Sequence, residues 1–199
     1  DRAMAFVTSD QVPKDAAALL ILSLAKGLSG RGKSFRDVVH RQPENVRVRI
    51  DELLHEARTT AADSQHEIER RRQAIQLLPY SQWEKVDDLL SSLLSAQEPA
   101  AIQLAAIQSL SAFDNEEVAS RLVSSWRGLS PAVRGEAAEA LLAVDDRAKA
   151  LLHAVLSGNI PAANVAPARQ QLLLNHSNTA LGSLAEEEFS KLSRPERAK

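Results

Sequence analysis

The chain has 199 residues, 24 Lys and Arg against 26 Asp and Glu, a formal net charge of −2 and no cysteine. This charge balance is not that of a general nucleic-acid binder, and the lack of cysteine excludes disulfides, thiolate metal ligands and a covalently attached c-type haem. Apolar residues make up 44% but aromatic residues only 4%, so the core must be built from Leu and Ala. That favours packed helices over a β-sandwich.

Neither a membrane span nor a leader is visible in the sequence. No apolar run reaches the length of about 18 residues that a spanning helix needs, and the segment 1–7 lacks the layout of a signal peptide. We expect no membrane insertion by this segment. Because the chain begins at Asp1 and ends at Lys199 in polar sequence, we expect it to be a piece of a longer protein.

Apolar residues recur at helical spacing along nearly the whole chain. One stripe is Val46, Ile50, Leu53, Leu54, Ala57 and Ala61, and another is Val86, Leu89, Leu90, Leu93 and Leu94. The pattern predicts helices at 13–29, 44–62, 65–78, 81–96, 100–113, 115–128, 131–144, 146–157, 167–174 and 178–192.

Several predicted helix starts carry capping signals. Ser64, Ser81 and Asp114 are each followed three residues later by Glu, a pattern that satisfies free backbone amides at a helix N-terminus. Pro43 and Pro131 stand where a first helical residue tolerates a missing amide.

Self-comparison indicates a helical repeat. Residues Ile102, Ala106, Leu110 and Phe113 match Val133, Ala137, Leu141 and Val144 at a spacing of 31, and Leu181, Ala185, Phe189 and Leu192 match the second set at 48, which leaves 17 extra residues. The breaker clusters 158–161 and 165–167 lie there and predict an inserted loop with a short helix. We expect one continuous domain, with N-terminal helices at 1–63 and repeats at 64–199 interrupted near 158–167.

A phosphate-binding loop is the main alternative. The segment Gly27–Ser34 satisfies the Walker A pattern, in which Gly32, Lys33 and Ser34 would bind the phosphates and magnesium. The segment 140–145 resembles a Walker B segment. A true P-loop leaves a β-strand, whereas residues 16–22 have a helical composition. A turn between two helices is the favoured interpretation.

Other chemistry-bearing patterns are weaker. Ser23 and Lys26 have the spacing of serine-lysine acylases without the partner motifs. The histidines occur singly, without ligand spacing, at His40, His55, His66, His153 and His176. Adjacent acids at 87–88, 145–146 and 186–188 point in different directions on a helix. We therefore expect no catalytic site, metal or cofactor.

The stretch from about Ala57 to Leu192 resembles a known family. The shared segments are 56–63, 73–78, 98–107, 129–134, 158–161 and 167–176. They resemble the HEAT-repeat region of large multidomain, haem-binding, membrane-bound dehydrogenase proteins of planctomycetes and verrucomicrobia. The resemblance implies a right-handed α-α superhelix that connects a β-propeller to a c-type cytochrome domain, and an extracytoplasmic or periplasmic location in a bacterium.

The predicted function is that of a non-catalytic scaffold whose partners are protein domains of the same parent chain or of another protein. The candidate contact residues are Arg134, Arg169, His176 and Trp126, although Trp126 and Trp83 also fit core packing. No small-molecule substrate is evident. The segment from Lys26 to Arg49 holds seven basic and two acidic residues. It leaves binding of phosphate, an acidic partner or nucleic acid as alternatives to a solvated surface, with nucleic acid not expected.

Overall fold

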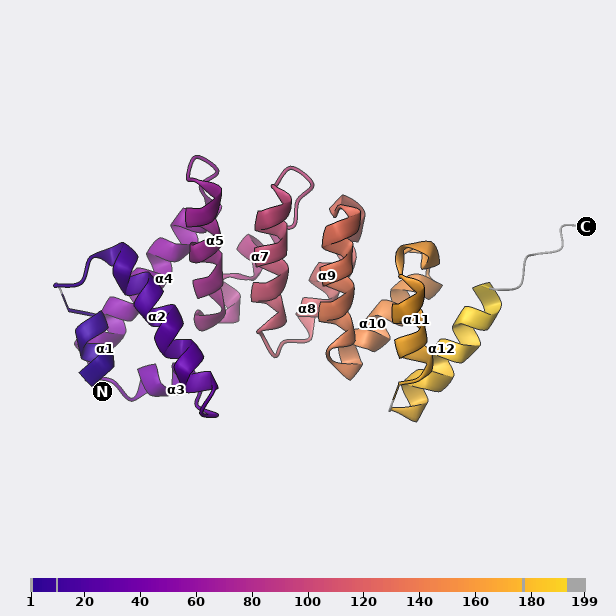
Figure 1. Ribbon diagram of the computed structural model, residues 1–199, viewed down its shortest axis with the longest axis horizontal. Coiled ribbons are helices and arrows are strands. Elements are labelled where there is room, and N and C mark those ends of the chain that lie inside the picture. The colour runs from indigo at the N-terminus through magenta and orange to yellow at the C-terminus, as the bar shows by residue number, and fades with distance from the viewer. Residues whose placement is uncertain (1, 10, 177, 193–199) are drawn as a thin grey trace, which may run out of the picture. The chain divides into compact units, whose positions relative to one another are not determined.

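A computed structural model describes residues 2–9, 11–176 and 178–192 of the chain (Figure 1). Within these ranges the backbone forms twelve α-helices and four short 3-10 helices, and it forms no strand. The fold class is therefore all-α, as the composition and periodicity predict. Contacts divide the chain into two units, residues 1–93 and 94–199, and each is described by itself.

The first unit contains six α-helices and two 3-10 helices. They are α1 (Arg2–Val7), α2 (Lys14–Ser29), α3 (Phe35–His40), α4 (Glu44–Ala62), α5 (Ile68–Leu77), η1 (Leu78–Tyr80), η2 (Trp83–Lys85) and α6 (Asp87–Ser92). Helix α5 packs against α4 and α2, so it belongs with the N-terminal helices. The division into units falls after residue 93.

Helix α4 shows how the apolar spacing produces the core of this unit. Its predicted stripe is buried at every position, from Val46 to Ala61, because residues three and four apart share one face of a helix. Helix α3 was not predicted. It is a single short segment whose Phe35 is buried and whose start is capped by Ser34, which accepts a hydrogen bond from the Asp37 amide at 3.4 Å.

The predicted helix at 81–96 is interrupted. Residues Trp83–Lys85 form a 3-10 turn, Val86 leaves the helical region at φ −133°, and α6 covers only Asp87–Ser92. Both Trp83 and Val86 are buried, so tertiary packing overrides the continuous helical pattern here.

Two of the predicted capping boxes are wrong. Neither Ser64 nor Ser81 caps a helix, since α5 and η2 begin after Glu67 and Gln82 without a side-chain cap. At the third site the oxygen comes from Asn115, which accepts from the Glu117 amide at 2.8 Å. Pro131 is the first residue of α9, as expected, whereas Pro43 is the N-cap residue before α4.

The second unit contains six α-helices and two 3-10 helices within its described residues. They are α7 (Ala100–Ser111), α8 (Glu117–Ser125), η3 (Trp126–Gly128), α9 (Pro131–Leu142), α10 (Asp145–Leu156), η4 (Ala162–Asn164), α11 (Pro167–Leu174) and α12 (Thr179–Leu192). Consecutive helices form three packed pairs, α7 with α8, α9 with α10 and α11 with α12, while α7 also packs on α9 and α10 on α8 and α12. Figure 1 shows α7, α9 and α11 in one row, with α8, α10 and α12 in a second.

The matched residues of the repeat occupy the core of this unit. Ile102, Ala106 and Leu110 on α7 and Val133, Ala137 and Leu141 on α9 are all fully buried. The fourth match fails at Val144, which is 43% exposed because it lies beyond α9, in extended backbone immediately before α10.

The third matched set lies on the second helix of a pair, whereas the first two sets lie on first helices. Leu181 and Ala185 are buried as expected, and the side chain of Leu192 lies outside the described residues. They stand on α12, which packs against α10 and α11 and is therefore the second helix of its pair. The helix equivalent to α9 is α11. The 17 extra residues arise because the sequence comparison matched α9 with α12, which is one helix too far along the chain.

The connection between α10 and α11 is longer than its counterparts but is firmly packed. Gly158 follows the C-cap Ser157 with φ 73°, a left-handed conformation that glycine adopts without steric cost. The turn sends Ile160 and Val165 into the core, where both are buried. The breaker clusters thus mark a structured connector.

Candidate functional site

The Walker A segment is a turn between two helices. Gly27 lies within α2, Gly30 ends that helix, Gly32 turns the chain with φ 67°, and Lys33 is exposed. Ser34 serves as the cap of α3. The segment therefore leaves the C-terminal end of a helix, where free carbonyls face an incoming phosphate, instead of leaving a strand.

The companion motifs also stand on helices. Residues 140–145 run from the end of α9 into α10, so they form no Walker B strand. Ser23 lies on α2 and donates its hydroxyl proton to the Leu19 carbonyl at 2.9 Å, a bond to the helix backbone and not to Lys26.

The proposed contact residue Trp126 is part of the core. Its side chain is 1% exposed, and its indole nitrogen has no hydrogen-bond partner within the described residues. The ring cannot reach a partner in this conformation. This corrects its assignment as a surface anchor and leaves core packing as its role.

Arg134 is occupied by contacts within the chain. Its Nε donates to the Trp126 carbonyl at 3.1 Å, Nη2 to the Arg127 carbonyl at 3.2 Å, and Nη1 to Asn164 Oδ1 at 2.8 Å. The side chain thus joins α9 to the turn before it and to the connector after α10.

Arg169 and His176 also tie neighbouring helix pairs together. Arg169 Nε of α11 lies 2.7 Å from Glu139 Oε1 of α9. His176 Nδ1 accepts from the Asn178 amide at 3.1 Å, which leaves the Nε2 hydrogen facing Asp145 Oδ1 at 3.8 Å. Asn178 Nδ2 donates to the other oxygen of Asp145 at 2.7 Å. The three polar candidates therefore hold adjacent parts of the second unit together.

A contact that the sequence did not reveal recurs at the fourth residue of four helices. Gln103 of α7 donates to the Leu94 and Ser95 carbonyls at 3.4 and 2.7 Å, and Gln170 of α11 to those of Ala162 and Val165 at 3.2 and 2.8 Å. Arg134 of α9 does the same, as does Arg71 of α5 with the Ala61 carbonyl at 3.0 Å. Each side chain therefore donates to backbone carbonyls that lie shortly before its own helix, in addition to the backbone amides that some of these carbonyls accept. We call these four residues the tethers.

A groove of about 450 Å³ lies in the first unit, over one face of α4. Its lining residues on this helix are Glu44, Arg47, Val48, Ile50, Asp51, Leu54 and Arg58. Ile50 and Leu54 are buried and form the floor, whereas Val48 is 52% exposed. Because residues three and four apart share one face of a helix, this face of α4 carries both the apolar residues of the groove floor and the charged residues of its rim.

The two walls of the groove come from distant parts of the sequence. One wall is α3, with Phe35, Arg36, Val39 and His40, and the other is the segment 80–85. The Phe35 and Tyr80 rings have centroids 4.9 Å apart at a tilt of 55°, and Arg36 Nη2 donates to the Pro79 carbonyl at 2.9 Å. These contacts fix the walls against each other.

Burial affects one ionisable group of this groove. It raises the pKa of Tyr80 above its ordinary value of 10.0, because a phenolate loses solvation beside apolar neighbours. The hydroxyl is thus neutral at physiological pH and available to donate a hydrogen bond.

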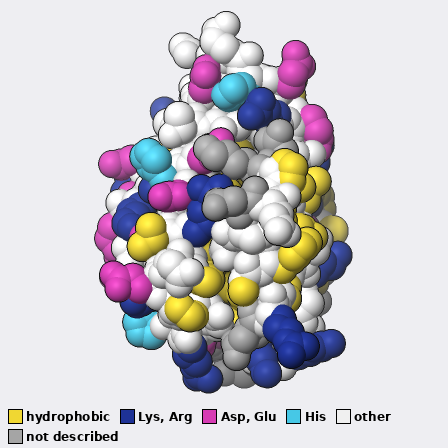
Figure 2. All heavy atoms as spheres, turned by 90° about the vertical axis from the view of Figure 1, so that its left-hand side faces the viewer, with side chains coloured by type: hydrophobic (Ala, Val, Ile, Leu, Met, Phe, Trp, Pro, Cys, Tyr) yellow, Lys and Arg dark blue, Asp and Glu magenta, His cyan; other side chains and the backbone are white. Residues whose placement is uncertain are grey.

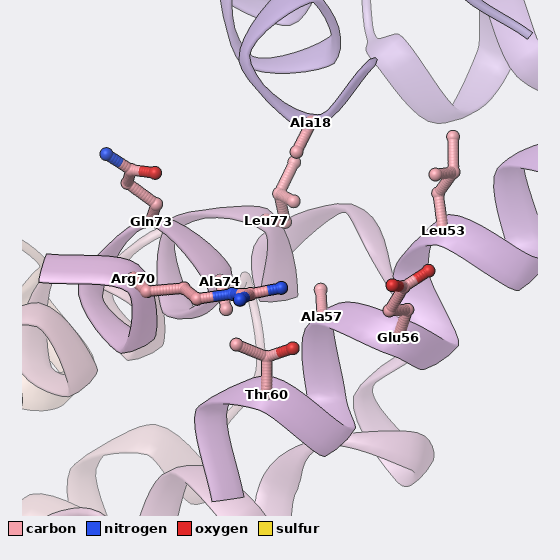
Figure 3. Close-up of a pocket in the computed structure, with 9 residues that line it drawn as sticks. All are labelled: Ala18, Leu53, Glu56, Ala57, Thr60, Arg70, Gln73, Ala74 and Leu77. Atoms are coloured by element: carbon pink, nitrogen blue, oxygen red, sulfur yellow. The ribbon is translucent and has the colours of Figure 1, made fainter. Parts of the chain in front are cut away.

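A second hollow lies between α2, α4 and α5. Figure 3 shows Leu77 directed toward Ala18 and the Arg70 side chain extending toward Ala57. Its volume is about 60 Å³, which is enough for a few water molecules. The groove over α4 is therefore the better candidate for binding a partner.

Within the described ranges, no three His, Asp or Glu side chains gather where they could hold a metal ion. Among the same residues, no helix combines the length and apolarity needed to cross a membrane. Comparison with protein-family models, curated proteins and solved structures gives no match. The resemblance to the dehydrogenase-linked repeats stays a prediction from sequence.

Proposed function

We propose that this chain is a non-catalytic helical-repeat module of the HEAT-like kind, a right-handed superhelix whose surface binds protein domains. The tethers are the observation that carries the proposal. They recur at spacings of 32, 31 and 36 residues, from Arg71 to Gln103, Arg134 and Gln170, and each donates to backbone carbonyls shortly before its own helix. Repeats of this length, each stabilised by its neighbour, are typical of helical solenoids.

The proposed role is that of a connector. A module built of mutually tethered helix pairs can hold other domains at fixed positions without any chemistry of its own. The resemblance implies a bacterial dehydrogenase-like protein outside the cytoplasm, in which this module would lie between a β-propeller and a cytochrome domain. Any redox chemistry would then belong to those flanking domains, because this chain has no cysteine to attach a haem.

Isothermal titration calorimetry tests this role. The domains that flank this segment in its full reading frame are expressed separately and titrated into the chain. We expect saturable one-to-one binding of at least one domain, with the negative heat-capacity change that apolar burial produces. Flanking domains that release no binding heat at several temperatures would contradict the connector role.

A further inference from the structure

The groove over α4 is lined by more basic than acidic side chains. Its lining includes Arg36, Arg47, Arg58 and Lys85 against the two acids Glu44 and Asp51. Arg47 and His40 are exposed, and their side chains make no hydrogen bond or ion pair with the described part of the chain.

The remaining groove charges have weak or internal partners. Lys85 Nζ reaches Asp51 Oδ2 only at 4.0 Å, between exposed side chains, a pair of low energy in water. Arg58 is turned inward, toward Ser81 Oγ at 3.4 Å and His55 Nδ1 at 3.2 Å. The rim therefore attracts anions through Arg47 and Lys85.

The interior of the groove is apolar and partly aromatic. Phe35, Ile50 and Leu54 line it and are buried, and Val39 and Tyr80 line it and are half-buried. Apolar surface of this kind favours a large apolar side chain, and the neutral Tyr80 hydroxyl can donate to a carbonyl or carboxylate.

The distribution of charge around the groove favours an acidic peptide over a nucleic acid as its ligand. Glu44 and Asp51 stand on the same rim as the cations, and a regularly charged phosphate backbone would meet both. A peptide can place its carboxylates opposite Arg47 and Lys85 and its neutral residues opposite the two acids. Figure 2 shows Lys and Arg side chains gathered at the lower edge of this end of the molecule, where Figure 1 places α3 and the turn before it.

We infer that this groove binds an acidic peptide segment of a partner protein, with one large apolar side chain seated between Val39 and Tyr80 and carboxylates facing Arg47 and Lys85. The inference rests on the proposed function and gives the module a specific docking site. Binding would use a preformed site, because the Phe35–Tyr80 and Arg36–Pro79 contacts already hold the walls in place.

Fluorine NMR on fluorotyrosine-labelled chain tests the inference, since Tyr80 is the single tyrosine of the sequence and gives one resonance. The probe is a short peptide of Glu and Asp residues with one central Phe. We expect a saturable shift of the Tyr80 resonance at micromolar to millimolar peptide. The double variant Arg47→Glu, Lys85→Glu should weaken binding by at least about tenfold, because both contacts become repulsive.

The matched control is the double variant Lys26→Glu, Arg127→Glu, which changes the net charge equally at exposed positions on α2 and η3, two elements that do not line the groove. It should bind within about twofold of the unaltered chain, because screening limits the effect of distant surface charges. Replacing the central Phe of the peptide by Ser should also weaken binding, since the apolar contact is lost.

Three results would overturn the inference. They are an unmoved Tyr80 resonance, equal weakening by the groove and control variants, and tighter binding of a single-stranded oligonucleotide with steep salt dependence. Calorimetry with the flanking domains distinguishes a wrong docking site from a wrong connector role. If those domains bind while the peptide does not, the proposed docking site is wrong and the connector role stands. If neither the domains nor the peptide bind, the docking site and the connector role are both wrong.

Discussion

Gln103 is a polar residue in the core, and its side-chain amide satisfies two backbone carbonyls beyond the end of α6. Gln108, on the same helix, is exposed and supplies a control of identical chemistry. Truncating this buried donor removes its bonds to both carbonyls, of which the Ser95 carbonyl keeps a bond from the Glu98 amide. The loss still costs more than that of a solvated side chain.

We predict that Gln103→Ala lowers the free energy of unfolding of the second unit by about 1–3 kcal/mol. Gln108→Ala should change it by less than about 0.5 kcal/mol. Urea denaturation followed by Trp126 fluorescence, in a Trp83→Phe background that leaves one reporter, measures both. Equal effects of the two substitutions would refute the tether role of Gln103.

Tyr80 supplies a second test at this scale. Its pKa is raised by burial, so the folded state holds the phenolic proton more tightly than the unfolded state does. The resulting stability is complete below about pH 10 and is lost as the pH rises through the folded pKa. Spectrophotometric titration of tyrosinate should give a higher midpoint in buffer than in concentrated urea. A folded midpoint equal to or below the urea value would show that Tyr80 is not buried.

At the scale of the element, most helices could be predicted from the spacing of apolar residues, and the exceptions have physical causes. The stripe from Val46 to Ala61 encodes α4 directly because it exceeds four turns. Helices α1 and α3 are each only six residues long and leave too little periodicity to detect. The equivalence of α11 with α9 was hidden because Arg169 replaces a buried apolar residue, and the tether Gln170 is the feature the two helices share.

Substitution of Arg134 tests whether the tether contacts stabilise the elements that they join. Arg134→Ala removes the bond to Asn164 and two bonds to the turn before α9. We predict that the Asn164 and Val165 amides, which are hydrogen-bonded within η4, exchange with solvent at least about fivefold faster. Amide exchange followed by NMR measures this. Arg127→Ala, at an exposed neighbour, should leave both rates unchanged, and parallel acceleration there would contradict the account.

The candidate groove could be predicted only in part, because it exists only in the whole fold of the first unit. The basic segment from Lys26 to Arg49 was visible in the sequence, and Arg36 and Arg47 come from it. The wall that holds Tyr80 and Lys85 follows more than thirty residues later along the chain, and no local pattern links it to α3. The contacts of the polar candidates Arg134, Arg169 and His176 could not be predicted for the same reason, since their partners Asn164, Glu139 and Asp145 are distant in sequence.

Thermal melting with magnesium-ATP tests most directly whether this chain acts through its surface or through nucleotide chemistry at Gly27–Ser34. A ligand at one hundred times its dissociation constant stabilises a protein by about 2.7 kcal/mol, a readily measured shift. Because Lys33 and Ser34 lie in a turn between helices, we predict an unchanged Tm at millimolar nucleotide. A saturable rise in Tm that Lys33→Ala abolishes would contradict the account.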